Sequence, residues 1–142
     1  MEINRITPDE HIFSQRLAHI ANPPKSLCYM GKLPETEAPV VSIVGSRKPS
    51  AYGKEVTERL ATDLAKAGCV IVSGLALGVD CIAQKAAIEA GGTVVAVVPN
   101  ELPDISPRTN YQLAMSIIEQ GGAVVSEWMK GDNKIAVSYT HL

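Results

Sequence analysis

Residues 40–80 read VVSIVGSRKPSAYGKEVTERLATDLAKAGCVIVSGLALGVD, a stretch in which apolar runs alternate with glycine-containing loops. Residues 40–44 form a short, β-branched run, which predicts a strand buried on both faces of a sheet. A helix is predicted over residues 54–67, because its larger apolar residues recur at helical spacing. These residues are Val56, Leu60 and Leu64, and Gly68 follows as a stop. Residues 69–72 then predict a second strand.

The same alternation continues beyond residue 80. The predicted elements are a helix that begins at a capping Asp80 and ends at Gly91, a strand over residues 93–98, a helix over residues 110–120 and a strand over residues 123–125. Strands and helices in this order, with right-handed crossovers, indicate an α/β, Rossmann-like parallel sheet with helices on both faces. Such sheets bind ligands at the carboxyl ends of their strands. The predicted loops at that edge are residues 45–53, 73–78 and 100–109.

Residues 1–38 predict an N-terminal helix and a lead-in segment. Thr7, Pro8 and Glu10 form the pattern of a helix start, with a capping box between Thr7 and Glu10. Phe13, Leu17 and Ile20 form its expected apolar face. Residues 27–33 are a candidate strand before a linker rich in Pro and Glu.

Composition restricts the kinds of partner that the chain can have. The 142 residues are 46% hydrophobic and 20% charged, with a formal net charge of -2. An overall attraction to nucleic acid is therefore excluded, and any such binding must come from a local cluster of Lys and Arg.

Cys28, Cys69 and Cys81 lack the spacing of a zinc site. With no signal-peptide pattern and no apolar run of about 18 residues, we expect a cytoplasmic protein without a membrane span, metal or cofactor.

The first loop carries the strongest candidate site. Gly45 allows a ligand to approach the backbone closely, and Arg47 offers a planar fork suited to phosphate, with Ser46 and Lys48 beside it. The loop amides and the next helix N-terminus favour an anion. The spacing is neither that of a Walker A loop nor that of a dinucleotide fingerprint. The alternative interpretation is that Gly45 is a turn residue and Arg47 a solvated charge.

The second and third loops add weaker candidates at the same edge. Gly74 is expected to let backbone amides line the ligand cleft, whereas Asp80 is interpreted as an ordinary helix cap. Arg108 is a second candidate phosphate ligand, and Asn110 either caps its helix or contacts a ligand. Taken singly, Arg108 and Asn110 each fit a structural role as well as a functional one. Their convergence with Arg47 on one edge favours the functional interpretation.

Patterns for catalysis are weak. His11, His19 and His141 lie outside the loop-bearing unit, and the sequence holds no paired carboxylates, metal cluster or nucleophile elbow. We therefore predict no catalytic residue. The alternative is a nucleotide-binding or nucleotide-hydrolysing enzyme on a related Rossmann-like fold. The P-G-G-x-G-T-x-x-E loop of phosphoribohydrolases of that kind does not occur in this sequence.

Two stretches, VSIVGSRKPSAYG at residues 41–53 and VSGLALGVD at residues 72–80, resemble the DNA-processing protein A family, also called DprA or Smf. The resemblance covers roughly residues 13–131 and implies that residues 39–131 are the first part of the family's Rossmann-like domain. It implies a cytoplasmic protein that binds single-stranded DNA, protects it during natural transformation and helps to load the recombinase RecA, as a homodimer when full length. Carried over by position, the implied phosphate-binding residues are Gly45, Ser46 and Arg47, then Gly74, then Arg108 and Asn110.

The chain also departs from the family pattern. Gln84 stands where the family usually has His, Ser106 replaces an aromatic residue that could stack on a base, and Trp128-Met129 replaces a more usual Tyr-Pro. Residues 132–142 match nothing expected there, which favours a non-native tail or a gene that is cut short. On this hypothesis the Rossmann-like domain is incomplete, and its last strand, residues 123–125, is an unprotected edge.

Overall fold

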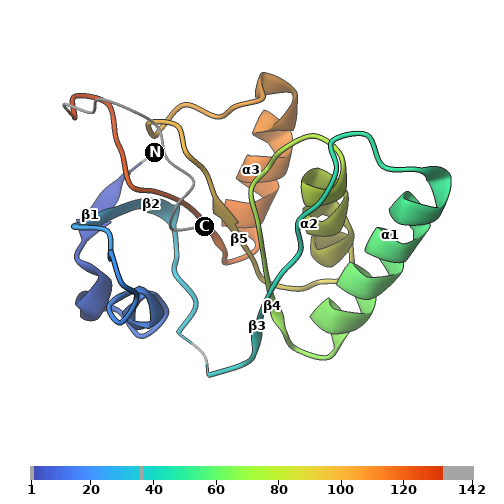
Figure 1. Cartoon of the computed structure of the whole chain (residues 1–142), viewed down its shortest axis with the longest axis horizontal. Coiled ribbons are helices and arrows are strands. Elements are labelled where there is room, and N and C mark those ends of the chain that lie inside the picture. The colour runs from blue at the N-terminus through green and yellow to red at the C-terminus, as the bar shows by residue number, and fades with distance from the viewer. Residues whose placement is uncertain (1, 36, 133–142) are drawn as a thin grey trace.

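The computed structural model of the chain describes residues 2–35 and 37–132, which are built around a six-stranded sheet (Figure 1). The strands are β1 (Asn4–Ile6), β2 (Leu27–Gly31), β3 (Val40–Ser42), β4 (Val70–Ser73), β5 (Val94–Val97) and β6 (Ala123–Ser126). They lie in the order β1-β2-β6-β5-β4-β3. The four strands from β3 to β6 are parallel, whereas β2 pairs antiparallel with β6 and β1 antiparallel with β2. The sheet is therefore mostly parallel, and the α/β, Rossmann-like fold is confirmed.

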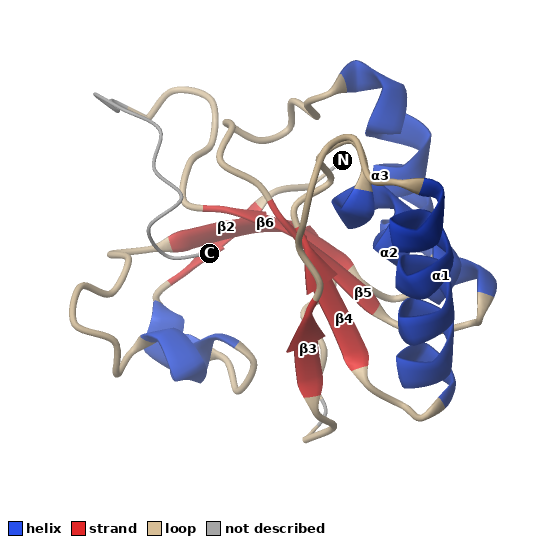
Figure 2. Cartoon of the chain, turned by 45° about the vertical axis from the view of Figure 1, so that its right-hand side comes forward, coloured by secondary structure: helices blue, strands red, loops and turns tan. Residues whose placement is uncertain are grey.

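Three α-helices connect the parallel strands: α1 (Ala51–Lys66), α2 (Val79–Glu89) and α3 (Tyr111–Glu119). Because these strands lie side by side in chain order, right-handed crossovers place the three helices on the same face of the sheet, as Figure 2 shows. The short 3-10 helices η1 (Pro8–Glu10) and η2 (Ser14–Leu17) belong to the segment that packs on the other face, and η3 (Arg108–Asn110) precedes α3. The two faces thus carry helices of different kinds.

Aliphatic side chains fill both sides of the sheet. Ile71, Val94 and Val124 face the α-helices and pack with Ala87 and Ile117. On the other face, Val70, Val95 and Val125 pack with Leu27 and Leu33, and Phe13 and Leu17 lie against them. Because alternate residues of each strand point to opposite faces, continuous runs of Val and Ile supply both clusters.

Several local predictions need correction at β3 and α1. β3 is an edge strand of the described sheet and is not buried on both faces. Helix α1 begins at Ala51 rather than at residue 54, because the Ser50 side chain accepts a hydrogen bond from the Gly53 N–H at 3.1 Å. Leu60, predicted to be on the buried stripe, is 51% exposed. The buried face of α1 consists of the small residues Thr57, Ala61 and Ala65, which allow α1 to approach α2 closely.

The N-terminal segment and the last strand also differ from expectation. In place of one helix beginning at Thr7, the chain forms the two short helices η1 and η2, and β1 precedes them. The Thr7 hydroxyl donates to the carboxylates of Asp9 and Glu10 and does not cap the backbone. Strand β6 is not an edge strand, because β2 pairs with it in a register that places Cys28 opposite Ser126. Because the two strands are so distant in the sequence, no local pattern of residues predicts their pairing.

The segment after β6 is tied back to β1. The Arg5 guanidinium contacts both carboxylate oxygens of Asp132, at 2.7 and 2.9 Å. A hydrogen bond from the Met129 N–H and the one from Arg5 lower the pKa of the Asp132 carboxyl. Residues 133–142, the remainder of the predicted tail, lie outside the described residues. No helix in the described part of the chain is long and apolar enough to cross a membrane.

Ser50→Ala tests where α1 begins. The substitution removes the oxygen that accepts from the Gly53 N–H, so we expect the free energy of unfolding to fall by about 1 kcal/mol in urea denaturation. Ser50→Asp keeps an acceptor at this position and serves as the matched control, with little change expected. If Ser50→Ala leaves the free energy of unfolding unchanged, the result would instead support a helix that begins near residue 54.

Candidate nucleic-acid interface

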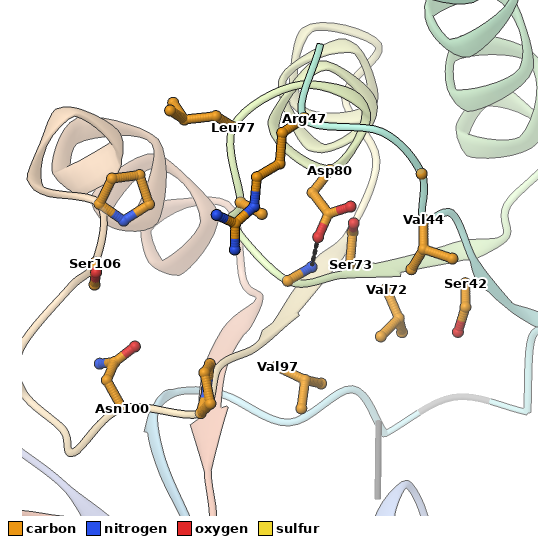
Figure 3. Close-up of a pocket in the computed structure, with 15 residues that line it drawn as sticks. Ser42, Val44, Arg47, Val72, Ser73, Leu77, Asp80, Val97, Asn100 and Ser106 are labelled. Atoms are coloured by element: carbon orange, nitrogen blue, oxygen red, sulfur yellow. Dashed lines mark hydrogen bonds between the residues drawn. The ribbon is translucent and has the colours of Figure 1, made fainter. Parts of the chain in front are cut away.

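A cleft of about 610 Å³ opens at the carboxyl ends of β3, β4 and β5. Its lining includes the aliphatic residues Val44, Val72 and Val97. Figure 3 shows the Arg47 side chain reaching into the cleft from the first loop, with Asn100 and Ser106 on the third loop across from it. The expectation that the loops converge on this edge of the sheet is therefore confirmed.

The first two loops are locked together by close backbone contacts. The Val79 N–H donates to the Ser46 carbonyl oxygen at 3.0 Å, and the Ser46 hydroxyl accepts from the Lys48 N–H at 3.0 Å. Gly78 has a φ of 86°, and a Cβ there would overlap the Ser46 carbonyl oxygen and lie 2.6 Å from the Arg47 Cα. A Cβ at Gly45 would lie 2.9 Å from a methyl group of Val79. Glycine at positions 45 and 78 therefore permits this approach of the two loops.

Backbone donors are left over in both loops. Within the described residues, the amides of Gly45, Ser46 and Arg47 donate no hydrogen bond, and neither do those of Ala76, Leu77 and Gly78. Backbone N–H groups that donate no hydrogen bond inside the protein can donate to an anion. The cleft thus combines a guanidinium with unused backbone donors.

The cations of the interface are free of acidic partners. Arg47, Lys48 and Arg108 are all exposed, and in residues 2–35 and 37–132 none of them has a carboxylate oxygen within 4.0 Å. Arg47 lines the cleft, whereas Lys48 and Arg108 lie outside its lining. A phosphate in the cleft can therefore reach Arg47 without breaking an existing ion pair.

The second loop is arranged differently from its prediction. Asp80 does not cap α2; Gly78 occupies the N-cap position, and Asp80 lies in the first turn. One carboxylate oxygen of Asp80 accepts the Gly74 N–H at 3.0 Å, so this amide is already used. Gly74 lines the cleft, but its N–H is not available to a phosphate as the sequence suggested. A side-chain acceptor six residues further along the chain could not be recognised from the motif.

Asn110 likewise has a structural contact. Its side chain makes no capping hydrogen bond to α3 and instead donates from Nδ2 to the Leu75 carbonyl oxygen at 2.6 Å. Of the seven predicted site residues, the structure brings Gly45, Arg47 and Gly74 into the lining of the cleft. Ser46 and Lys48 flank Arg47, while Arg108 and Asn110 lie on η3 next to the third loop.

Sequence reasoning did not assign four polar residues to the cleft: Ser42, Ser73, Asp80 and Asn100. Asp80 is only 8% exposed and brings a carboxylate into the lining. Asn100 lines the opposite wall, donates from Nδ2 to the Asp104 carbonyl oxygen, and has a buried Oδ1 without a partner among the described residues. Its position two residues after the predicted strand over residues 93–98 was the available signal. In the described part of the chain no group of three or more His, Cys, Asp or Glu residues could hold a metal ion.

Comparison with known proteins gives consistent matches. Residues 4–141 match the family model described as DNA recombination-mediator protein A. Protein Smf of Escherichia coli is 38% identical over 123 residues, which are 87% of this chain and 33% of that protein. DNA processing protein DprA of Bacillus subtilis is 37% identical over 113 residues, 79% of this chain and 38% of that protein. The chain thus spans about a third of the length of these curated relatives.

Two solved structures share the fold. DNA processing protein A from Helicobacter pylori, studied for its single-stranded DNA binding mode, has a TM-score of 0.76 and 36% identity, covering 94% of this chain and 59% of that one. DNA processing protein A from Streptococcus pneumoniae has a TM-score of 0.79 and 30% identity, covering 99% of this chain and 48% of that one.

Gly78→Ala tests the contact between the loops. A methyl group there meets the Ser46 and Arg47 backbone, so we expect lower stability and shifted amide resonances at residues 45–48 in NMR spectra. Gly68→Ala is the matched control, because Gly68 also has a positive φ, 92°, but nothing lies within 4 Å of an added Cβ. Gly78 also has a ψ of -132°, a backbone conformation that only glycine adopts readily, so Gly78→Ala should lose more stability than Gly68→Ala, and the loop resonances report the contact itself. Equal losses of stability, with unshifted loop resonances, would contradict the contact.

Proposed function

The chain belongs to the family of DNA recombination-mediator protein A, and on this premise we propose that its cleft binds the phosphate backbone of single-stranded DNA. The observation that carries the proposal is Arg47, which reaches into the cleft without an acidic partner in the described chain, beside backbone amides that donate no hydrogen bond. Arginine side chains and free loop amides are among the groups that bind phosphate in proteins. The Helicobacter pylori relative, whose structure concerns single-stranded DNA, supports the same ligand.

Each residue has a distinct part in this proposal. Arg47 contacts one phosphate inside the cleft, while Gly45 and Ser46 contribute backbone N–H groups. Lys48 and Arg108 lie exposed outside the cleft lining and contact neighbouring phosphates along the strand. Since the formal net charge is -2, the attraction is local to these residues, and binding is sensitive to salt.

The remaining lining of the cleft sets the position and selectivity of the strand. The Asp80 carboxylate repels phosphate and keeps it on the Arg47 side of the cleft. Several aliphatic side chains line the cleft, and among the described residues no aromatic side chain does so, since Ser106 stands at the position expected to stack on a base. Contacts to phosphates carry no sequence information, so we propose binding without strong base preference.

The wider role follows the family. We propose that the complete protein protects single-stranded DNA during natural transformation and helps to load RecA, working in the cytoplasm as a homodimer. The description of the family as recombination mediators supports this role. The cleft serves binding in this proposal, and no reaction step is assigned to it.

Arg47→Ala tests the proposed function directly. Loss of one guanidinium–phosphate contact is expected to weaken binding of a labelled oligothymidylate about tenfold at low salt, in fluorescence anisotropy titrations. The dependence of log K on log salt should become shallower by about 0.7, the value for one phosphate of a single strand. Arg59→Ala is the control, because Arg59 is exposed on α1 and pairs with Glu55. No binding by the unmodified chain at low salt would overturn the proposal.

Asp80→Asn tests the electrostatic role of the second loop. The amide keeps an oxygen for the Gly74 N–H but removes the negative charge, so we expect DNA affinity to rise by about two- to fivefold at low salt. The gain should shrink as salt is added. Asp63→Asn, an exposed position on α1, provides the comparison for a change of net charge alone. A rise of the same size in both variants would show that the effect is not local to the cleft.

A further inference from the structure

The second loop contains a strained residue at its centre. Leu75 has a φ of 62° and is the one non-glycine residue with a positive φ in the described chain. Its side chain is fully buried, so a glycine could not replace it without leaving a cavity. A leucine adopts this left-handed conformation only where its surroundings hold it there, and such residues cluster at functional sites.

Two side chains from different helices hold Leu75. On α2, the fully buried Gln84 accepts the Leu75 N–H at its Oε1, at 3.1 Å, and donates from Nε2 to the Ser73 carbonyl oxygen at 2.9 Å. Before α3, Asn110 donates to the Leu75 carbonyl oxygen at 2.6 Å. Both backbone polar groups of Leu75 are thus bound by side chains, an arrangement that we call the Leu75 clamp.

The conformation of Leu75 sets the course of the residues that follow it. Ala76 and Leu77 line the cleft directly after Leu75, and their amides belong to the unused donors described above. Gly78 and Val79 then pack on the Ser46 and Arg47 backbone of the first loop. A continuous path of backbone contacts therefore leads from Gln84 and Asn110 to the loop that carries Arg47.

We propose that Gln84 and Asn110 are positioning residues of the cleft, which fix Leu75 and thereby hold both loops in the geometry that binds phosphate. The proposal rests on the proposed function. To bind the Leu75 N–H and the Ser73 carbonyl oxygen together, the side chain at position 84 needs one hydrogen-bond acceptor and one donor side by side. A neutral histidine offers the same pair on its two ring nitrogens, whereas leucine offers neither. Among charged groups, the Asp80 carboxylate lies next to this segment, on the Gly74 N–H.

Substitutions of Gln84 distinguish positioning from mere stability. At about pH 8, where imidazole is neutral, we expect Gln84→His to bind a labelled oligothymidylate within about twofold of the unmodified chain. Gln84→Leu should bind at least about fivefold more weakly while remaining folded. Its Leu75 amide should exchange hydrogen faster than in the unmodified chain, with the amides of α1 unchanged. Ser14→Ala is the control, because it removes another buried hydrogen bond, to the Pro8 carbonyl oxygen, on the opposite face of the sheet.

The possible outcomes separate the two proposals. Equal DNA affinity and equal Leu75 exchange in Gln84→Leu and the unmodified chain would overturn the positioning role, as would a folded Gln84→His variant that loses as much affinity as Gln84→Leu. If Gln84→Leu does not fold, Asn110→Ala replaces it, and unchanged exchange at residues 75–78 overturns the clamp. If the unmodified chain binds no DNA, the proposed function fails, and the exchange rates alone decide the role of the clamp.

Discussion

The right-handed crossover between parallel strands is the constraint on which the rest of the structure depends. Each of the connections through α1, α2 and α3 leads to the next strand of the sheet, so the order β3-β4-β5-β6 follows the chain. All the carboxyl ends then lie at one edge, and the α-helices lie on one face (Figure 2). The described sheet has no reversal of strand order among these strands. The cleft is therefore shaped by the long first loop, which bends across the second, rather than by a crevice between diverging loops.

Much of this architecture could be predicted from sequence because it is encoded locally. Short β-branched runs predicted β4 and β5, and Gly68, Gly91 and Gly121 follow the helices with positive φ, as helix-ending glycines do. Contacts between distant segments were not encoded in this way. The pairing of β2 with β6 joins residues almost a hundred positions apart, and the alanine face of α1 has meaning only beside α2.

The candidate site shows the same difference between features that are encoded locally and contacts between distant segments. Arg47 could be identified because its position after a strand and a glycine is a local pattern, and it lines the cleft. The roles of Gly74 and Asn110 depend on partners in other elements, Asp80 and Leu75. A motif shows which residues stand in a loop, but it does not show which of their polar groups the fold has already used. Which of these groups are used depends on the hydrogen bonds that the folded chain makes between distant elements.

In the proposed function, binding in the cleft relies on geometry more than on charge. The chain is acidic overall, an acidic side chain lines the cleft beside its arginine, and among the described residues no aromatic ring lines the cleft to offer stacking energy. A flexible loop with one arginine would lose much of its contact energy to the ordering of its backbone. Loops that are already ordered avoid this loss, and here glycine contacts, the Asp80–Gly74 hydrogen bond and the Leu75 clamp fix both loops before a ligand arrives. In the proposed function, the strain at Leu75 is the energetic cost of holding both loops in order before phosphate binds.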